Sequence, residues 1–129
     1  MRRLVAERAG HRCEYCLLHE SDSYSPHQID HIVSRKHGGS SESDNLCYAC
    51  LRCNTWKGTD IGSIDLKSGR FVRLFDPRRD RWANHFKFHG PVIEPLSPEG
   101  FATARLLKLN IDKRVAERRL LQTIGSYPR

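Results

Sequence analysis

The sequence predicts a small α+β protein whose fold is held by a metal ion, and three observations support this class. Two Cys-x-x-Cys pairs, Cys13/Cys16 and Cys50/Cys53, bracket a β-branched run at residues 29–33 that is typical of a short strand. The second half continues with short apolar runs separated by Asp-Pro and Gly-Pro. It ends with two stretches that carry helix start and stop signals.

The length and charge of the chain narrow its class. At 129 residues it is about one domain long. Its 22 Lys and Arg residues against 15 Asp and Glu residues leave a formal charge of +7, so nucleic acid is the leading class of partner. The alternative is a basic surface that only aids solubility.

The distribution of charged and apolar residues also predicts the cellular compartment of the protein. Residues 1–7 carry charges where a signal peptide needs an apolar run, and no segment approaches the roughly 18 apolar residues of a membrane span. We therefore expect a soluble, cytoplasmic protein without membrane contact. In that reducing compartment, four of the five cysteines in two Cys-x-x-Cys pairs favour a metal over disulfides, which leaves Cys47 as the odd one.

Local signals place the first elements. Residues 2–9 lack helix breakers and put Leu4 and Val5 on one side of a short helix, with Gly10 just past its end. Residues 21–26 are typical of a loop.

The strand at residues 29–33 is expected to carry Asp30 and His31, either along its length or at its end. Residues 38–43 indicate a flexible polar loop, and a helical segment is expected over residues 54–57.

Residues 64–96 predict a small hairpin or meander. A helix capped by Ser97 then runs to about residue 109, and a second helix covers about residues 111–124. Three apolar positions at helical spacing in this second helix are assigned to the core, namely Ala116, Leu120 and Ile124.

No repeat or linker divides the chain, so a single domain is expected over residues 1–129. Its core covers about residues 10–60, and an extension of hairpin and helices covers about residues 61–129.

The cysteine pairs match a closed tetrahedral zinc site, because each two-residue spacer lets one turn of backbone present two sulfurs to the same ion. The expected ligands are Cys13, Cys16, Cys50 and Cys53. One of them could instead be replaced by His11, His19 or Cys47. Two disulfides or unrelated buried thiols are a further alternative. Four cysteine ligands leave no open position, so this zinc is expected to hold the fold without catalysing a reaction.

Between and beside the cysteines lie the candidate groups for chemistry on phosphate. A neutral histidine such as His31 can take a proton from water near physiological pH. The carboxylate of Asp30 and the amide oxygen of Asn54 can hold a hard divalent ion. Because neighbours on a strand point to opposite faces, Asp30 and His31 can share a site only if the strand ends or bends there. The alternative for this pair is a satisfied, partly buried structural role.

These groups stand within an ordered series of motifs: Asp30-His31-Ile32, Gly38-Gly39, Asn45-Leu46 and Cys50-Leu-Arg-Cys-Asn-Thr-Trp-Lys-Gly58. The series resembles the HNH endonuclease family in its form with a four-cysteine zinc site, over about residues 10–58. Agreement of several spaced elements in order makes the resemblance specific. It implies a ββα-metal (His-Me finger) core that cuts nucleic acid with one divalent cation. Here that core would carry an added β-hairpin and C-terminal helices.

The resemblance also implies roles. His31 falls on the general base, Asp30 and Asn54 fall on the metal-ligand positions, and Asn45 falls on the asparagine that constrains the loop and thereby orients the base. Asn54 departs from the namesake pattern, which has histidine there, although asparagine is a known alternative. An amide oxygen suits Mg²⁺ or Mn²⁺, so one of these ions is expected at the catalytic site.

The implied reaction is metal-assisted hydrolysis of a phosphodiester bond, in which His31 deprotonates water while the metal stabilises charge on the phosphate and the leaving oxygen. A single site is expected to nick one strand. The partner expected is double-stranded DNA bound through its backbone. One alternative is a noncatalytic zinc module that binds nucleic acid, and another is a structural zinc domain whose partner is a larger protein.

Basic residues outside the motif are candidate phosphate contacts. Lys57 lies three residues beyond Asn54 on the same side of a helix, and His37 precedes the Gly38-Gly39 loop. Two further clusters are Arg78, Arg79 and Arg81, and Lys113, Arg114, Arg118 and Arg119. For each of them, a solvated surface charge is the alternative.

Overall fold

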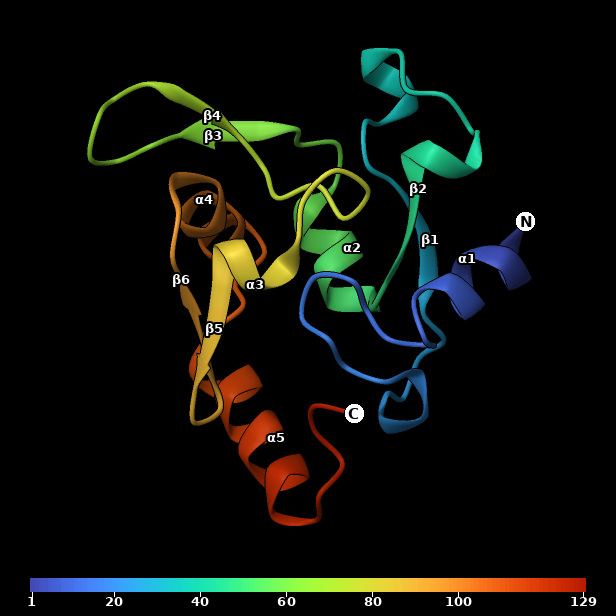
Figure 1. Ribbon diagram of the computed structural model, residues 1–129, viewed down its shortest axis with the longest axis vertical. Helices are drawn as coiled ribbons and strands as arrows, with labels where there is room; N and C mark the ends of the chain where they lie inside the picture. The colour runs from blue at the N-terminus through green and yellow to red at the C-terminus, as the bar shows by residue number, and fades with distance from the viewer.

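Five α-helices and three two-stranded antiparallel sheets make up the computed structural model, which describes residues 1–129 (Figure 1). The helices are α1 (Arg2–Arg8), α2 (Leu51–Lys57), α3 (Trp82–His85), α4 (Pro98–Leu106) and α5 (Asp112–Thr123). The sheets pair β1 (Gln28–His31) with β2 (Leu46–Ala49), β3 (Gly62–Ile64) with β4 (Phe71–Arg73), and β5 (Phe86–His89) with β6 (Val92–Pro95). The predicted α+β class is confirmed.

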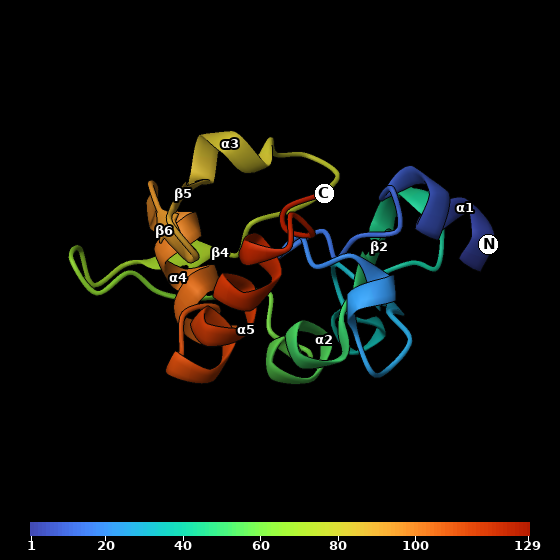
Figure 2. The ribbon, with the colours of Figure 1, turned by 90° about the horizontal axis from the view of Figure 1, so that it is seen from below.

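Helix α2 lies in the middle of the molecule. The β1–β2 sheet and α1 stand on one side of it, and α4, α5 and the β5–β6 sheet stand on the other (Figures 1 and 2). The candidate site is therefore built where α2 meets β1, with the C-terminal extension behind it.

Strand β1 ends earlier than its β-branched residues predict. Its register places Asp30 opposite Cys47 and His31 opposite Leu46, and the chain then bends at Ile32. The bend arises because the backbone N–H and C=O of Val33 hydrogen-bond to the Asn45 side chain and not to a neighbouring strand. His31 thus becomes the last residue of the strand.

Helix α2 begins at Leu51, three residues before the segment expected to be helical at residues 54–57, and it ends at Lys57 as expected. The sulfur of Cys50 caps its first turn by accepting a hydrogen bond from the Cys53 backbone N–H. Gly58 follows the last turn with a φ of +54°, a conformation that glycine adopts without strain. Together with β1 and β2, α2 forms the expected ββα unit.

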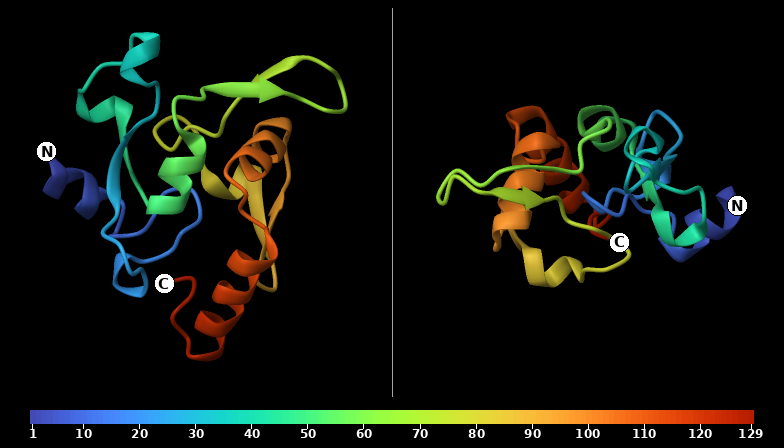
Figure 3. Two further views of the ribbon diagram at one scale, coloured as in Figure 1. Left: turned by 180° about the vertical axis from the view of Figure 1, so that it is seen from behind. Right: turned by 90° about the horizontal axis from the view of Figure 1, so that it is seen from above.

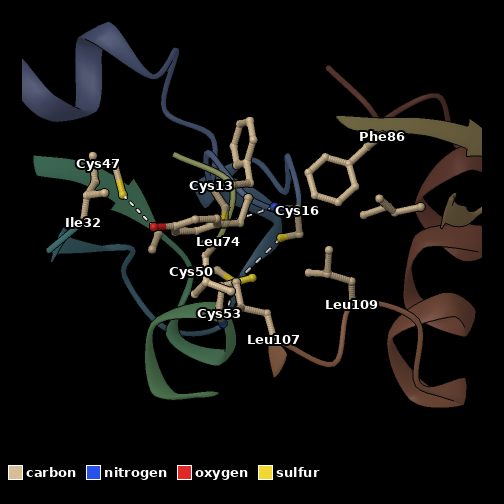
Figure 4. Close-up of a cluster of buried hydrophobic side chains, with 14 of the residues drawn as sticks. Cys13, Cys16, Ile32, Cys47, Cys50, Cys53, Leu74, Phe86, Leu107 and Leu109 are labelled. Atoms are coloured by element: carbon tan, nitrogen blue, oxygen red, sulfur yellow. Dashed lines mark hydrogen bonds between the residues drawn. The ribbon is translucent and has the colours of Figure 1, made fainter. Parts of the chain in front are cut away.

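One buried cluster links the cysteine segments with the extension. It contains all five cysteines and Tyr15, together with Leu74, Phe75, Phe86, Ile93, Leu107 and Leu109 (Figure 4). A smaller cluster holds α1 against β2 through Val5, Ala6 and Tyr48. Leu4, which was expected on the same buried side as Val5, is exposed.

The extension contains two hairpins where a single hairpin or meander was expected. Residues 71–73 form a strand as predicted, but Trp82 begins a helical turn and not a strand. The indole N–H of Trp82 donates to the backbone oxygen of Tyr15 at 2.9 Å, so tertiary contact decides the local structure here. Helix α4 begins as predicted, with the Ser97 hydroxyl accepting from the Gly100 backbone N–H at 3.0 Å.

Helix α5 buries a different face from the one its apolar residues indicate. Ala116, Leu120 and Ile124 are exposed, so their assignment to the core is wrong. The buried positions are Arg114 and Arg118, because their guanidinium groups bind inward-facing acceptors that satisfy their charge and donors.

None of the five helices has the length and apolar character needed to cross a bilayer.

Candidate active site and metal centre

The two Cys-x-x-Cys pairs converge on one point in the core (Figure 4). The Sγ atoms of Cys13, Cys16, Cys50 and Cys53 all lie within 4.8 Å of one another, and all four residues are buried and free of disulfides. The sulfurs of Cys16 and Cys50 are 3.7 Å apart. This is close to the edge of about 3.8 Å that a tetrahedron with Zn–S bonds of about 2.3 Å requires. The cluster therefore fits a structural zinc ion.

Local backbone geometry presents each pair to that point. The Cys16 backbone N–H lies 3.5 Å from the Cys13 sulfur, and the Cys53 backbone N–H lies 3.4 Å from the Cys50 sulfur. These contacts point N–H dipoles at sulfurs that carry negative charge when bound to a cation. The three residues weighed as substitutes stand outside the cluster, since His11 bonds to Glu20, His19 to Ser21, and Cys47 to Tyr15 and Asp30.

Burial makes the four thiols depend on a cation. It raises the pKa of Cys13 and Cys53 well above the ordinary value, because a buried thiolate loses its hydration. Hydrogen bonds from the neighbouring cysteines hold the pKa of Cys16 well below that value. Four buried thiolates repel one another, so an ion at their centre supplies the charge that lets them ionise together.

Arg114 brings a further positive charge to the cysteines. One guanidinium nitrogen lies 3.2 Å from the Cys53 sulfur and 3.8 Å from the Cys50 sulfur. Burial alone would lower the pKa of Arg114, but the neighbouring cysteine thiolates raise it. This contact connects helix α5 to the cysteine cluster. The guanidinium charge also balances part of the negative charge that four thiolates would carry.

Asp30 lies buried between β1 and α2, where it is 5% exposed. The Lys57 ammonium, 2% exposed, lies 3.1 Å from its Oδ2 and 3.3 Å from its Oδ1, and also donates to the His31 backbone oxygen at 3.0 Å. The Tyr15 hydroxyl donates to Oδ2 at 2.9 Å. Burial, followed by Cys47 and Asp30, raises the pKa of Tyr15 well above its usual range, so it stays a donor.

Asn54 and Lys57 project from α2 onto the same face of β1. The Lys57 ammonium contacts the Asp30 carboxylate. The Asn54 side-chain amide donates to the side-chain oxygen of Gln28, which lies two residues before Asp30 on the same face of the strand. The i,i+3 spacing on the helix thus matches the i,i+2 spacing on the strand. The Asn54 amide oxygen has no hydrogen-bond donor and is half-buried.

The carboxylate of Asp30 and the amide oxygen of Asn54 are hard oxygen ligands of the kind that Mg²⁺ and Mn²⁺ prefer, so the donor set fits such an ion. The ammonium of Lys57 already contacts both oxygens of the Asp30 carboxylate. Lys57 and a cation would therefore share or compete for Asp30.

His31 faces away from this pair, as strand alternation requires. It is half-buried, and its Nε2 lies 3.0 Å from the Ser41 hydroxyl. The strand ends at His31, which is the condition set for Asp30 and His31 to share one site. Their two side chains nevertheless have no hydrogen-bond partner in common. The bridge between them is the Lys57 ammonium, which contacts the carboxylate of one and the backbone oxygen of the other.

Asn45 closes the loop that follows β1. Its side-chain oxygen accepts from the Val33 backbone N–H at 3.0 Å, and its amide donates to the backbone oxygens of Val33 and Ser40 at 2.9 and 2.7 Å. Gly39 fits beneath this bridge because a Cβ there would lie 1.7 Å from the Val33 carbonyl oxygen. Asn45 thus constrains the loop that carries Ser41, while its effect on the chemistry of His31 stays a prediction.

The remaining predicted contacts fall into two groups. His37, Arg79 and Arg81 are exposed and have no ion-pair partner. Arg78 is half-buried and pairs with Glu14, and Lys57 is committed to Asp30. The expectation that Lys57 and Arg78 present their charges at the surface therefore does not match their positions, because each has a carboxylate partner from a distant part of the chain.

Sequence reasoning did not single out Tyr15, Gln28 or Ser41, and it assigned Arg114 to phosphate contact and not to the cysteines. Alternation from Asp30 would have placed Gln28 on the same strand face. The others reach their partners only through tertiary packing. A groove of about 630 Å³ between α5 and residues 22–25 contains none of Asp30, His31 or Asn54. This groove is therefore separate from the candidate site.

The segment that holds both cysteine pairs also matches a known family. Residues 13–60 match the family model described as HNH endonuclease. The matched segment includes Asp30, His31, Asn45 and Asn54. No curated protein and no solved structure matches the chain.

Proposed function

Because residues 13–60 match the HNH endonuclease family model, we propose that this chain is a metal-dependent endonuclease that hydrolyses phosphodiester bonds in DNA, one strand per site. The observation that carries the proposal is the position of His31. This half-buried histidine ends β1 beside the helix that bears Asn54, and its ring is held by Ser41. From there its imidazole can take a proton from water near neutral pH.

His31 is the general base in this proposal. When its Nε2–H donates to the Ser41 hydroxyl, Nδ1 is the unprotonated nitrogen and can accept the proton of an attacking water. Asn45 keeps the loop closed and thereby keeps Ser41 within reach of the ring.

Asp30 and Asn54 would hold the divalent ion, Mg²⁺ or Mn²⁺, and the four cysteines would hold zinc. When bound, the divalent ion supplies charge stabilisation for the phosphate and the leaving oxygen. The buried Lys57 ammonium pairs with the Asp30 carboxylate and thereby orients it. The exposed side chains of His37, Arg79 and Arg81 are proposed contacts to the DNA backbone.

The test is nicking of supercoiled plasmid by the purified protein with Mg²⁺, with Mn²⁺ and with EDTA. His31→Ala is expected to lower the rate by at least about 100-fold, since a general base contributes roughly 10² to 10⁴. Duplex binding should stay close to that of the parent. If a folded, zinc-loaded parent binds DNA but never nicks it, the protein is a noncatalytic binding module. If it binds no DNA at any salt concentration, its partner is a protein.

Ser41→Ala is expected to lower the nicking rate on the order of tenfold, a part of the contribution of the base, because the ring loses the contact that selects its tautomer. Substrate binding should not change. Ser40→Ala is the matched control, since the Ser40 hydroxyl contacts only the Glu42 backbone N–H. Single-turnover rates across pH would check this, and equal rates for the two variants would remove Ser41 from the mechanism.

A further inference from the structure

Several arginines that seemed available to nucleic acid are used inside the protein. Arg78 pairs with Glu14, Arg114 contacts the cysteines, and Arg118 binds the Pro91 oxygen and Asn110. A surface for DNA must therefore be sought among basic residues that are exposed and have no carboxylate partner.

The loop after β1 carries two such residues. Arg35 and Lys36 are exposed, form no ion pair, and lie in residues 34–41, here called the loop arm. Glu42 and Asp44 follow at its base, and neither forms an ion pair with Arg35 or Lys36. The loop arm begins three residues after His31 and is held by Asn45.

The β3–β4 hairpin carries two more. Residues 62–73, here called the hairpin arm, stand out from the body of the protein (Figure 1). Near its tip are Lys67 and Arg70, neither of which has a carboxylate partner. The only acidic side chain at the tip is that of Asp65, which is engaged by the Ser68 hydroxyl.

The hairpin arm also exposes large apolar side chains. Leu66 is 74% exposed and Phe71 is 64% exposed. Exposed apolar side chains of this size beside basic residues are typical of a surface that contacts a partner. Helix α4 holds the arm in place, because Arg105 donates to the Ile64 backbone oxygen at 2.8 Å and Lys67 lies 5.0 Å from the centre of the Phe101 ring.

Both arms start beside the candidate site. The loop arm follows His31, and the hairpin arm begins five residues after Lys57, whose ammonium contacts the His31 backbone oxygen. In two opposite views the arms stand at the same end of the molecule, on either side of the C-terminal end of α2 (Figures 1 and 3).

We propose that the loop arm and the hairpin arm hold one DNA duplex across the His31 site. Arg35, Lys36, Lys67 and Arg70 contact its phosphates, while Leu66 and Phe71 press against a groove. This inference rests on the proposed function. The charges supply affinity that does not depend on sequence, and the apolar tip suits a groove, where inserted apolar side chains can contact the bases.

The test measures binding of a short DNA duplex to the zinc-loaded protein at several salt concentrations with no Mg²⁺ or Mn²⁺ added, and every variant is made in the His31→Ala background. Lys67→Ala/Arg70→Ala and Arg35→Ala/Lys36→Ala are each expected to reduce the slope of log affinity against log salt by about two, because each phosphate contact contributes about 0.9. The control is Arg3→Ala/Lys87→Ala, which removes two exposed charges that lie outside both arms. Its slope should equal that of the parent background.

Parent-like slopes for both arm variants would overturn the inference and leave the apolar hairpin to a protein partner. An equal loss in the control would also overturn it, since net charge alone would then explain binding. The proposed nuclease activity fails separately. If the parent never nicks plasmid while the arm variants lose duplex binding, the proposed role of the arms is supported and the proposed nuclease activity is wrong. If the parent nicks plasmid and the arm variants bind duplex like the parent, the nuclease activity is supported and the proposed role of the arms is wrong.

Discussion

Removal of zinc is expected to abolish the folded state. Structural zinc sites contribute apparent free energies of about 10–16 kcal/mol, which equals or exceeds the 5–15 kcal/mol stability of a whole domain. Here the ion would join residues 13–16 to residues 50–53 at the centre of the main core, next to Leu107 and Leu109. Without it, the negative charge of four buried thiolates would be balanced in part by Arg114 alone.

Circular dichroism and thermal melting with and without a chelator would measure this effect, together with zinc content per chain. Cys53→Ser is expected to lose the ion and the cooperative melt. Cys47→Ser is the control, because Cys47 lies outside the cluster beside Tyr15 and Asp30, where a hydroxyl finds polar partners. The expectation is wrong if the chelated protein still melts cooperatively near the temperature of the parent.

Lys57→Met is expected to destabilise the zinc-loaded protein by about 3–5 kcal/mol when no Mg²⁺ or Mn²⁺ is added, because it leaves the buried Asp30 carboxylate without a counter-charge. Methionine keeps the volume of the side chain, so charge and not packing is removed. If Asp30 also binds the divalent ion, Mg²⁺ or Mn²⁺ should restore part of that stability by binding the folded state. Urea unfolding of the zinc-loaded protein without added divalent ion and in millimolar Mg²⁺ would show both effects.

The control is Asp30→Asn/Lys57→Met, which removes both charges of the pair. It should recover most of the lost stability, since replacing both partners of a buried pair is often close to neutral. It should also lose the response to Mg²⁺. If the double variant still gains stability from Mg²⁺, Asp30 is not the ligand. If Lys57→Met alone unfolds at the urea concentration of the parent, the pair does not support the fold.

Features that depend on local spacing were predictable. The turn geometry of Cys-x-x-Cys implies two sulfurs on one ion, and the four cysteines do converge. The Ser97 cap and the stop at Gly58 follow from side-chain and backbone preferences that act within one turn. The spacing from Asn54 to Lys57 likewise put both on one helix face.

Features that depend on distant partners were not predictable. Lys57 was expected at the surface, but the same helix face packs on β1, where Asp30 receives its charge. Arg78 finds Glu14 across 64 positions, and Arg114 finds Cys53 across 61. On α5 these long-range contacts outweigh the apolar pattern, since a buried guanidinium must be satisfied whereas an exposed leucine costs little.

By itself, the sequence of this protein determined which four cysteines converge, the ββα unit and the identity of the candidate base, because short-range spacing and motif order encode them. Only the tertiary structure decided which charges are buried, that Ser41 holds His31, and that two arms stand beside the site. Those properties depend on which surfaces the chain brings together, and residues far apart along it carry no local mark of their contact.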